Sequence, residues 1–103
     1  VVSMSKNKHF LTELFDNIEK KAKSKDSQSY TKKLLKSGKN KIAKKVGEES
    51  TELIIDYLKG SKKRTIEEAS DLIYHFFLLL YSKKISLNEI KKELKKRQNV
   101  RQK

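Results

Sequence analysis

Residues that make tight turns are scarce in this chain, and this scarcity limits its fold more than any other feature. The 103 residues include no proline and only three glycines. A β-sandwich or β-barrel needs many turns, so the sequence disfavours both architectures. The length suits one domain with a single core. We therefore expect an all-α fold, a small bundle of about five helices.

The spacing of apolar residues and the positions of turn residues locate these helices. Gly38 stands where a helix C-terminus is expected, and Ser86 with Glu89 forms a capping box that begins the last helix. The predicted helices cover residues 9–23, 30–37, 41–58, about 61–82 and 86–97. On this pattern we expect a flexible N-terminus over residues 1–8, a single domain over residues 9–97 and a polar tail over residues 98–103.

The fourth predicted helix is apolar on nearly every side from Leu72 onward. In so small a chain, such a helix is either central or packed against a second subunit, which favours a homodimer or a higher homo-oligomer. The apolar run from Leu72 to Tyr81 has about half of the roughly 20 residues that span a bilayer, and no signal-peptide pattern opens the chain. We therefore expect a cytoplasmic protein without membrane association.

The net charge of +13 indicates a polyanionic partner. Nucleic acid, an anionic membrane and a phosphorylated small molecule all fit this charge, as does a simple preference for surface lysine. Only three of the 26 basic residues are arginine, the residue most used to read DNA sequence. The absence of cysteine excludes disulfides, thiolate metal sites and a cysteine nucleophile.

The acidic residues are concentrated in two predicted helices. Glu48, Glu49 and Glu52 are spaced to share one face of the third helix, and Glu68 and Asp71 are three apart on the fourth. Antiparallel packing of the two helices would bring four or five carboxylates together, although like charges repel each other. A hard divalent cation such as Mg²⁺, which prefers oxygen ligands, would compensate this repulsion.

Two ordinary structural interpretations compete with a metal site. A run of charged residues is often just the solvated face of a helix. Glu67 and Glu68 also suit the first turn of a helix capped by Thr65, in which Glu68 would complete a capping box. Apolar residues follow both acidic groups directly, however, and this position beside the packing stripe favours a shared pocket over bulk solvent.

The acidic pattern resembles the motif of the all-α nucleotide pyrophosphohydrolases (MazG-like proteins). Within that superfamily the chain is most similar to the phosphoribosyl-ATP pyrophosphohydrolase family, over about residues 10–97. The segments that carry this closer resemblance are residues 29–38, 41–49, 71–75 and 85–87, with Glu93, Leu94 and Arg97 beyond them.

The resemblance implies a MazG-like helical homo-oligomer and a reaction. Phosphoribosyl-ATP and water would give phosphoribosyl-AMP and pyrophosphate, the second step of histidine biosynthesis, with Mg²⁺ as cofactor. Two alternatives stay open: a house-cleaning pyrophosphohydrolase of the same superfamily that acts on other nucleoside triphosphates, and a non-enzymatic helical module that binds nucleic acid. The concentrated acids make nucleic acid an unlikely partner.

The resemblance also implies roles for individual residues. The predicted Mg²⁺ ligands are Glu49, Glu52, Glu68 and Asp71. Glu48 is the catalytic candidate, either as the base that takes a proton from the attacking water or as the ligand of a further metal ion. Lys45 and Lys41 are predicted to meet the pyrophosphate end of the substrate, and the contacts to ribose or phosphate are predicted for Ser29, Tyr30 and Thr31. The alternative for these last three is a helix cap with an apolar anchor.

Overall fold

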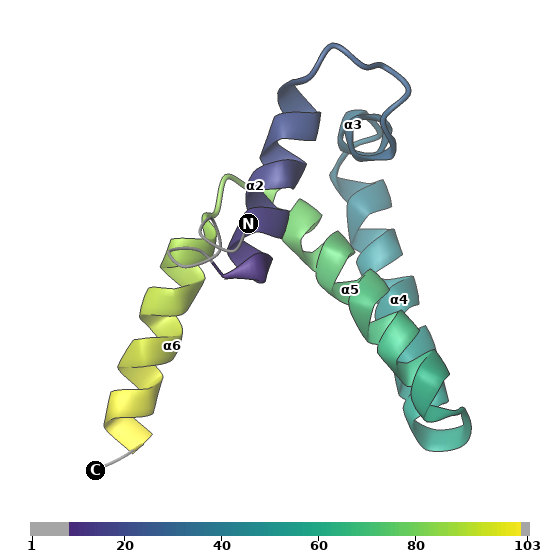
Figure 1. Ribbon diagram of the computed structural model, residues 1–103, viewed down its shortest axis with the longest axis vertical. Coiled ribbons are helices and arrows are strands. Elements are labelled where there is room, and N and C mark those ends of the chain that lie inside the picture. Colours follow the sequence, from purple (N-terminus) through teal and green to yellow (C-terminus); the bar gives the residue numbers. More distant parts are fainter. Residues whose placement is uncertain (1–8, 102–103) are drawn as a thin grey trace, which may run out of the picture.

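Two long antiparallel helices, α4 (Lys39–Lys59) and α5 (Lys62–Ser82), form the main hairpin of the molecule. This computed structural model describes residues 9–101, with side chains through Gln98, and every regular element among them is a helix (Figure 1). The prediction of an all-α fold is therefore confirmed. The predicted N-terminal segment, residues 1–8, lies outside the described residues, as do residues 102–103 of the predicted tail.

The turn between α4 and α5 places the two acidic segments opposite each other. Gly60 ends α4, and Ser61 caps α5 by accepting a hydrogen bond from the backbone amide of Arg64 (3.1 Å). This cap rules out the alternative in which Thr65 caps the helix. Glu68 therefore lies in the second turn of α5, and its side chain does not complete a capping box.

Two shorter helices pack against this hairpin. Helix α2 (Phe10–Lys23) contacts α3 and α5, and α3 (Tyr30–Lys36) also lies against α4 and α5 (Figure 1). Leu78 of α5 is fully buried between Leu34 of α3 and Ile42 of α4. This small core fixes α3 beside the N-terminal half of α4, so that both helices can contribute side chains to one site.

The last helix, α6 (Leu87–Arg101), extends away from the rest of the molecule (Figure 1). The predicted capping box is present, because the backbone amides of Ser86 and Glu89 each donate to the other residue's side chain. Among the described side chains of α6, Leu87 and Ile90 at its start pack against the core formed by α2 and α5. No helix within residues 9–101 is long and apolar enough to cross a membrane.

Candidate metal centre

Carboxylate groups from α4 and α5 meet across the hairpin. One oxygen atom from each of Glu49, Glu68 and Asp71 lies within 4.8 Å of the other two. Glu49 and Glu68 are buried, with 8% and 4% of their surfaces exposed, whereas Asp71 is at the open edge of the group. The structure thus brings together three of the four predicted metal ligands.

The fourth predicted ligand, Glu52, borders the same cluster. The pKa of Glu52 is raised, first because its protonated carboxyl group can hydrogen-bond to Glu68 and second because the two negative charges repel each other. Partial desolvation and the charge of Glu49 raise this pKa further, while Lys45 opposes the shift. Glu52 therefore lies beside Glu68, but it is exposed and lies outside the group of three oxygen atoms.

Two oxygen atoms of this cluster have no partner within the described part of the chain. Glu49 Oε1 and Glu68 Oε1 are buried and accept no hydrogen bond. A buried polar atom without a partner costs about 1–3 kcal/mol, and more when it is charged. A cation between the two helices would satisfy both atoms. Because the donor set consists of carboxylate oxygens alone, it fits a hard ion such as Mg²⁺ and does not resemble a zinc site.

Each buried glutamate also has a basic neighbour four residues earlier on its own helix. Lys45 Nζ lies 3.6 Å from Glu49 Oε2, and Arg64 Nη2 lies 2.6 Å from Glu68 Oε2. Burial alone lowers the pKa of Lys45, but the nearby Tyr30, Glu49 and Glu48 raise it above its ordinary value. The site thus has more carboxylates than basic groups, with one basic side chain beside each buried glutamate.

Glu48 and Lys41 lie outside the carboxylate cluster. Both side chains are exposed on α4, and the group of three carboxylate oxygen atoms found among the described residues does not include Glu48. Glu52, four residues further on, is likewise exposed and outside this group, so of the three predicted glutamates of α4 only Glu49 is buried against α5. Consecutive helical residues differ by about 100° in direction, so Glu49 turns toward α5 while Glu48 turns toward solvent.

The predicted substrate-binding segment begins α3, next to the acids. Ser29 caps this helix by accepting a hydrogen bond from the backbone amide of Lys32, as expected from the alternative of a helix cap. Thr31 is buried, with its hydroxyl bonded to that of Tyr74.

Tyr30, between these two residues in sequence, borders a cavity. Burial raises the pKa of Tyr30, with nearby Lys45 acting in the opposite direction. A cavity of about 400 Å³ adjoins this segment and is lined by Lys21, Ser24, Asp26, Ser29, Tyr30, Thr31 and Tyr74. Tyr30 thus lines this cavity and lies near Lys45, the basic neighbour of Glu49.

His75 links this segment to α5. Its Nδ1 lies 2.8 Å from the carbonyl oxygen of Asp71, and its Nε2 lies 2.8 Å from the hydroxyl of Tyr30. A carbonyl can only accept, so Nδ1 carries a proton, and in the neutral imidazole Nε2 then accepts from Tyr30. The sequence places His75 near the acids through its spacing from Asp71, but it does not identify Tyr30 as its partner.

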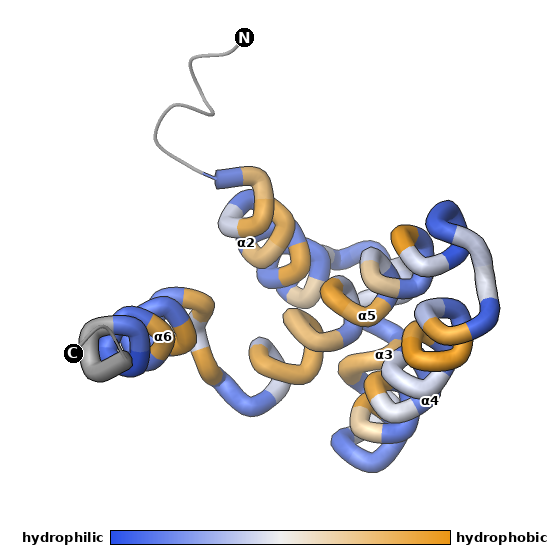
Figure 2. Tube along the Cα trace, turned by 90° about the horizontal axis from the view of Figure 1, so that it is seen from below, coloured by the Kyte–Doolittle hydropathy of each residue, from blue (hydrophilic) through white to orange (hydrophobic). Residues whose placement is uncertain are grey.

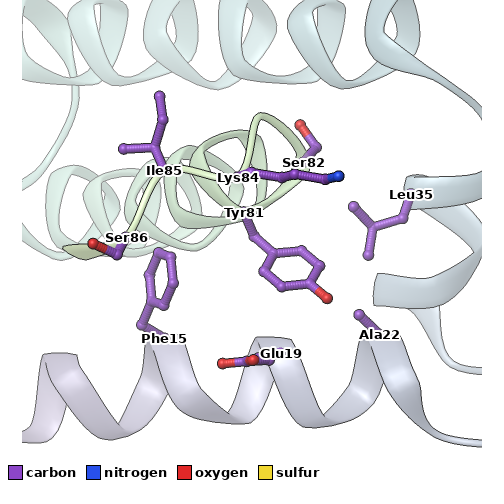
Figure 3. Close-up of a pocket in the computed structure, with 9 residues that line it drawn as sticks. All are labelled: Phe15, Glu19, Ala22, Leu35, Tyr81, Ser82, Lys84, Ile85 and Ser86. Carbon is purple, nitrogen blue, oxygen red and sulfur yellow. The ribbon is translucent and has the colours of Figure 1, made fainter. Parts of the chain in front are cut away.

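A second cavity lies away from the acids. It has a volume of about 530 Å³ and lies between α2, the start of the α5–α6 connection and the end of α3 (Figure 3). Phe15, Leu35 and Tyr81 form much of its wall. None of the clustered carboxylates lines it, so the larger volume of this cavity does not make it the better candidate for phosphate chemistry.

The raised pKa of Glu52 predicts a pH-dependent stability for the metal-free protein. The folded state holds this proton more tightly than the unfolded chain, whose carboxyl has its ordinary pKa of 4.5. The resulting stabilisation is present below that pKa and is lost as the pH rises through the higher folded value. In chelator, the melting temperature of the wild type should therefore fall relative to that of Glu52→Gln as the pH is raised above 4.5. Circular dichroism melts at each pH test this, and parallel profiles for the two proteins would contradict it.

Comparison with known proteins identifies the family. A family model for phosphoribosyl-ATP pyrophosphohydrolase matches residues 11–98. A phosphoribosyl-ATP pyrophosphatase from Bacillus cytotoxicus is 45% identical over 87 residues, which cover 84% of this chain and 81% of that protein. The histidine biosynthesis bifunctional protein HisIE of Bacteroides thetaiotaomicron is 44% identical over 88 residues, or 85% of this chain and 43% of that longer protein. This chain therefore belongs to the phosphoribosyl-ATP pyrophosphohydrolase family.

Proposed function

We propose that this chain hydrolyses phosphoribosyl-ATP to phosphoribosyl-AMP and pyrophosphate, the second step of histidine biosynthesis, and that it uses Mg²⁺. Family membership supports the reaction. The observation that best supports the use of Mg²⁺ is the pair of buried oxygen atoms without a partner on Glu49 and Glu68. We place the reaction in the cytoplasm, since a highly charged substrate does not cross a bilayer unaided.

The carboxylates of α4 and α5 would hold the metal. Glu49, Glu52, Glu68 and Asp71 supply oxygen ligands from two helices, and their excess charge favours a divalent cation over water. When bound, Mg²⁺ would neutralise charge on the triphosphate and lower the pKa of a coordinated water. The protein's contribution is then mainly to position the reactants and to stabilise developing charge.

The other predicted residues would act around this centre. Lys45, which lies 3.6 Å from Glu49 and near Tyr30, is placed to meet a phosphate that approaches the metal. Lys41 lies one turn earlier on α4, where it can reach the distal phosphate. We assign the ribose side of the substrate to the cavity beside Ser29, Tyr30 and Thr31. Glu48, at the exposed edge, keeps its two candidate roles as base or as ligand of a further metal ion.

A pyrophosphate-release assay tests this proposal directly. With phosphoribosyl-ATP, we expect turnover in Mg²⁺ and loss of at least about 100-fold in EDTA, because the triphosphate charge is then uncompensated. Activity should return when Mg²⁺ is added in excess. Equal rates with and without chelator would overturn the proposed dependence on Mg²⁺. Turnover of dUTP or dCTP without turnover of phosphoribosyl-ATP would instead favour the house-cleaning alternative.

We further propose that the working enzyme is a homodimer. Large apolar side chains are exposed on α4 and α5, including Ile54, Tyr57, Leu58 and Ile66, each more than half exposed. Figure 2 shows hydrophobic residues along these two helices, whereas α6 is mostly hydrophilic. An apolar surface of this kind is typical of a contact between subunits.

Charge placed on this apolar surface should dissociate the dimer. The double variant Ile54→Glu with Leu58→Glu puts two carboxylates one turn apart, and burying them would cost several kcal/mol. Light scattering should then report the 12.1 kDa monomer in place of twice that mass. Gln28→Glu, which adds a charge to an exposed loop, is the control and should leave the mass unchanged. A monomeric wild type would contradict the proposal.

A further inference from the structure

The two buried glutamates of the metal centre are held in the same way. In both cases a basic residue four positions earlier approaches the Oε2 atom: Lys45 reaches Glu49, and Arg64 reaches Glu68. In both cases the Oε1 atom is left buried and without a partner. Each glutamate therefore has one oxygen held by its own helix and one free for a ligand.

We propose that Arg64 is a positioning residue that turns Glu68 so that its Oε1 faces the metal site. This inference rests on the proposed metal centre and adds a residue that the acidic motif does not contain. A charge-assisted hydrogen bond of 2.6 Å is short and directional, so it fixes the rotation of the carboxyl group as well as its position. Groups that orient metal ligands in this way matter nearly as much as the ligands themselves.

Arg64 is itself held firmly. Its backbone amide donates to the Ser61 cap, its Nη1 donates to Glu67 Oε1 at 2.7 Å, and its Nη2 lies 3.8 Å from Asp56 Oδ2 on α4. The guanidinium group thus spans both helices of the hairpin. A planar fork with several donors can keep these contacts together, whereas a lysine ammonium at the same place could make fewer of them.

The opposite role for Arg64, as a cation that competes with the metal, is less well supported. Its side chain is 54% exposed, so solvent screens its repulsion of a bound ion. Glu68, by contrast, is almost completely buried, and its orientation is decided by the contacts it makes there. Orientation should therefore outweigh repulsion, which predicts weaker metal binding when Arg64 is removed.

Binding of Mn²⁺ to the metal-free protein, measured from the free-ion signal in electron paramagnetic resonance, tests this prediction without any turnover. We expect Arg64→Gln to weaken Mn²⁺ binding by about 10- to 100-fold. Arg64→Lys, which keeps the charge but loses the fork, should restore part of that loss. Circular dichroism melts confirm that each variant is folded, and if Arg64→Gln does not fold, the comparison of Arg64→Lys with wild type decides.

A control variant separates positioning from general effects of charge. Arg97→Gln removes an arginine that pairs with Glu93 at the same four-residue spacing on α6. It should bind Mn²⁺ as the wild type does. Equal or tighter binding by Arg64→Gln would overturn the positioning role while leaving the metal site in place. A wild type that binds no Mn²⁺ would overturn the metal site and the role of Arg64 with it.

Discussion

Replacing Glu49 with glutamine should lower pyrophosphate release from phosphoribosyl-ATP by more than about 100-fold, since even groups outside the ligand set change metal sites by 10- to 100-fold. Glu49 is 8% exposed and offers a buried oxygen without a partner. Glutamine has nearly the same shape but removes the negative charge that would hold the proposed divalent cation. Initial rates at saturating Mg²⁺ measure the loss, and a melting curve should show that the metal-free variant stays folded.

Glutamine variants of two other glutamates serve as comparisons for Glu49→Gln. Glu93→Gln changes an exposed residue of α6 and should leave the rate unchanged. Glu48→Gln separates the two roles left open for that residue: loss of rate with unchanged Mn²⁺ binding supports a base, and loss of a bound ion supports a ligand. If Glu49→Gln kept more than a tenth of the wild-type rate, Glu49 would not be a metal ligand.

Most of the fold could be predicted because local signals mark the ends of its helices. Gly38 follows the end of α3, and the Ser86–Glu89 box begins α6, as expected from the chemistry of each residue. The errors lie at boundaries. Helix α6 continues to Arg101, four residues past its predicted end, because its lysine- and arginine-rich sequence is compatible with helix in the absence of a stop signal.

The candidate site could be predicted in part. Spacing along two helices placed Glu49, Glu52, Glu68 and Asp71 where an antiparallel hairpin would bring them together, and the structure has that hairpin. The contact between Tyr30 and His75 could not be found in this way, because the residues are 45 positions apart and meet only through tertiary packing. The Arg64–Glu68 pair did have a local signal, namely the same spacing that links Lys45 to Glu49.

Tertiary packing between α3, α4 and α5 makes the buried Leu78 important for stability. Leu78→Ala should lower the free energy of unfolding by about 2–5 kcal/mol, because the site is fully buried and the cavity cannot close completely. Small domains have only about 5–15 kcal/mol in total, so the loss is a large fraction of the stability. Urea unfolding followed by circular dichroism, at one protein concentration for all variants, measures the change.

The position of Leu78 also connects stability to the site. It packs against Leu34 of α3 and Ile42 of α4, so a cavity there loosens the two helices that carry Tyr30 and Lys45. Leu78→Met keeps most of the volume and should cost less than about 1.5 kcal/mol. We therefore expect Leu78→Ala to lose activity at temperatures where Leu78→Met keeps it. A loss below about 1 kcal/mol for the alanine variant would show that this core is not what holds α3 beside the carboxylate cluster.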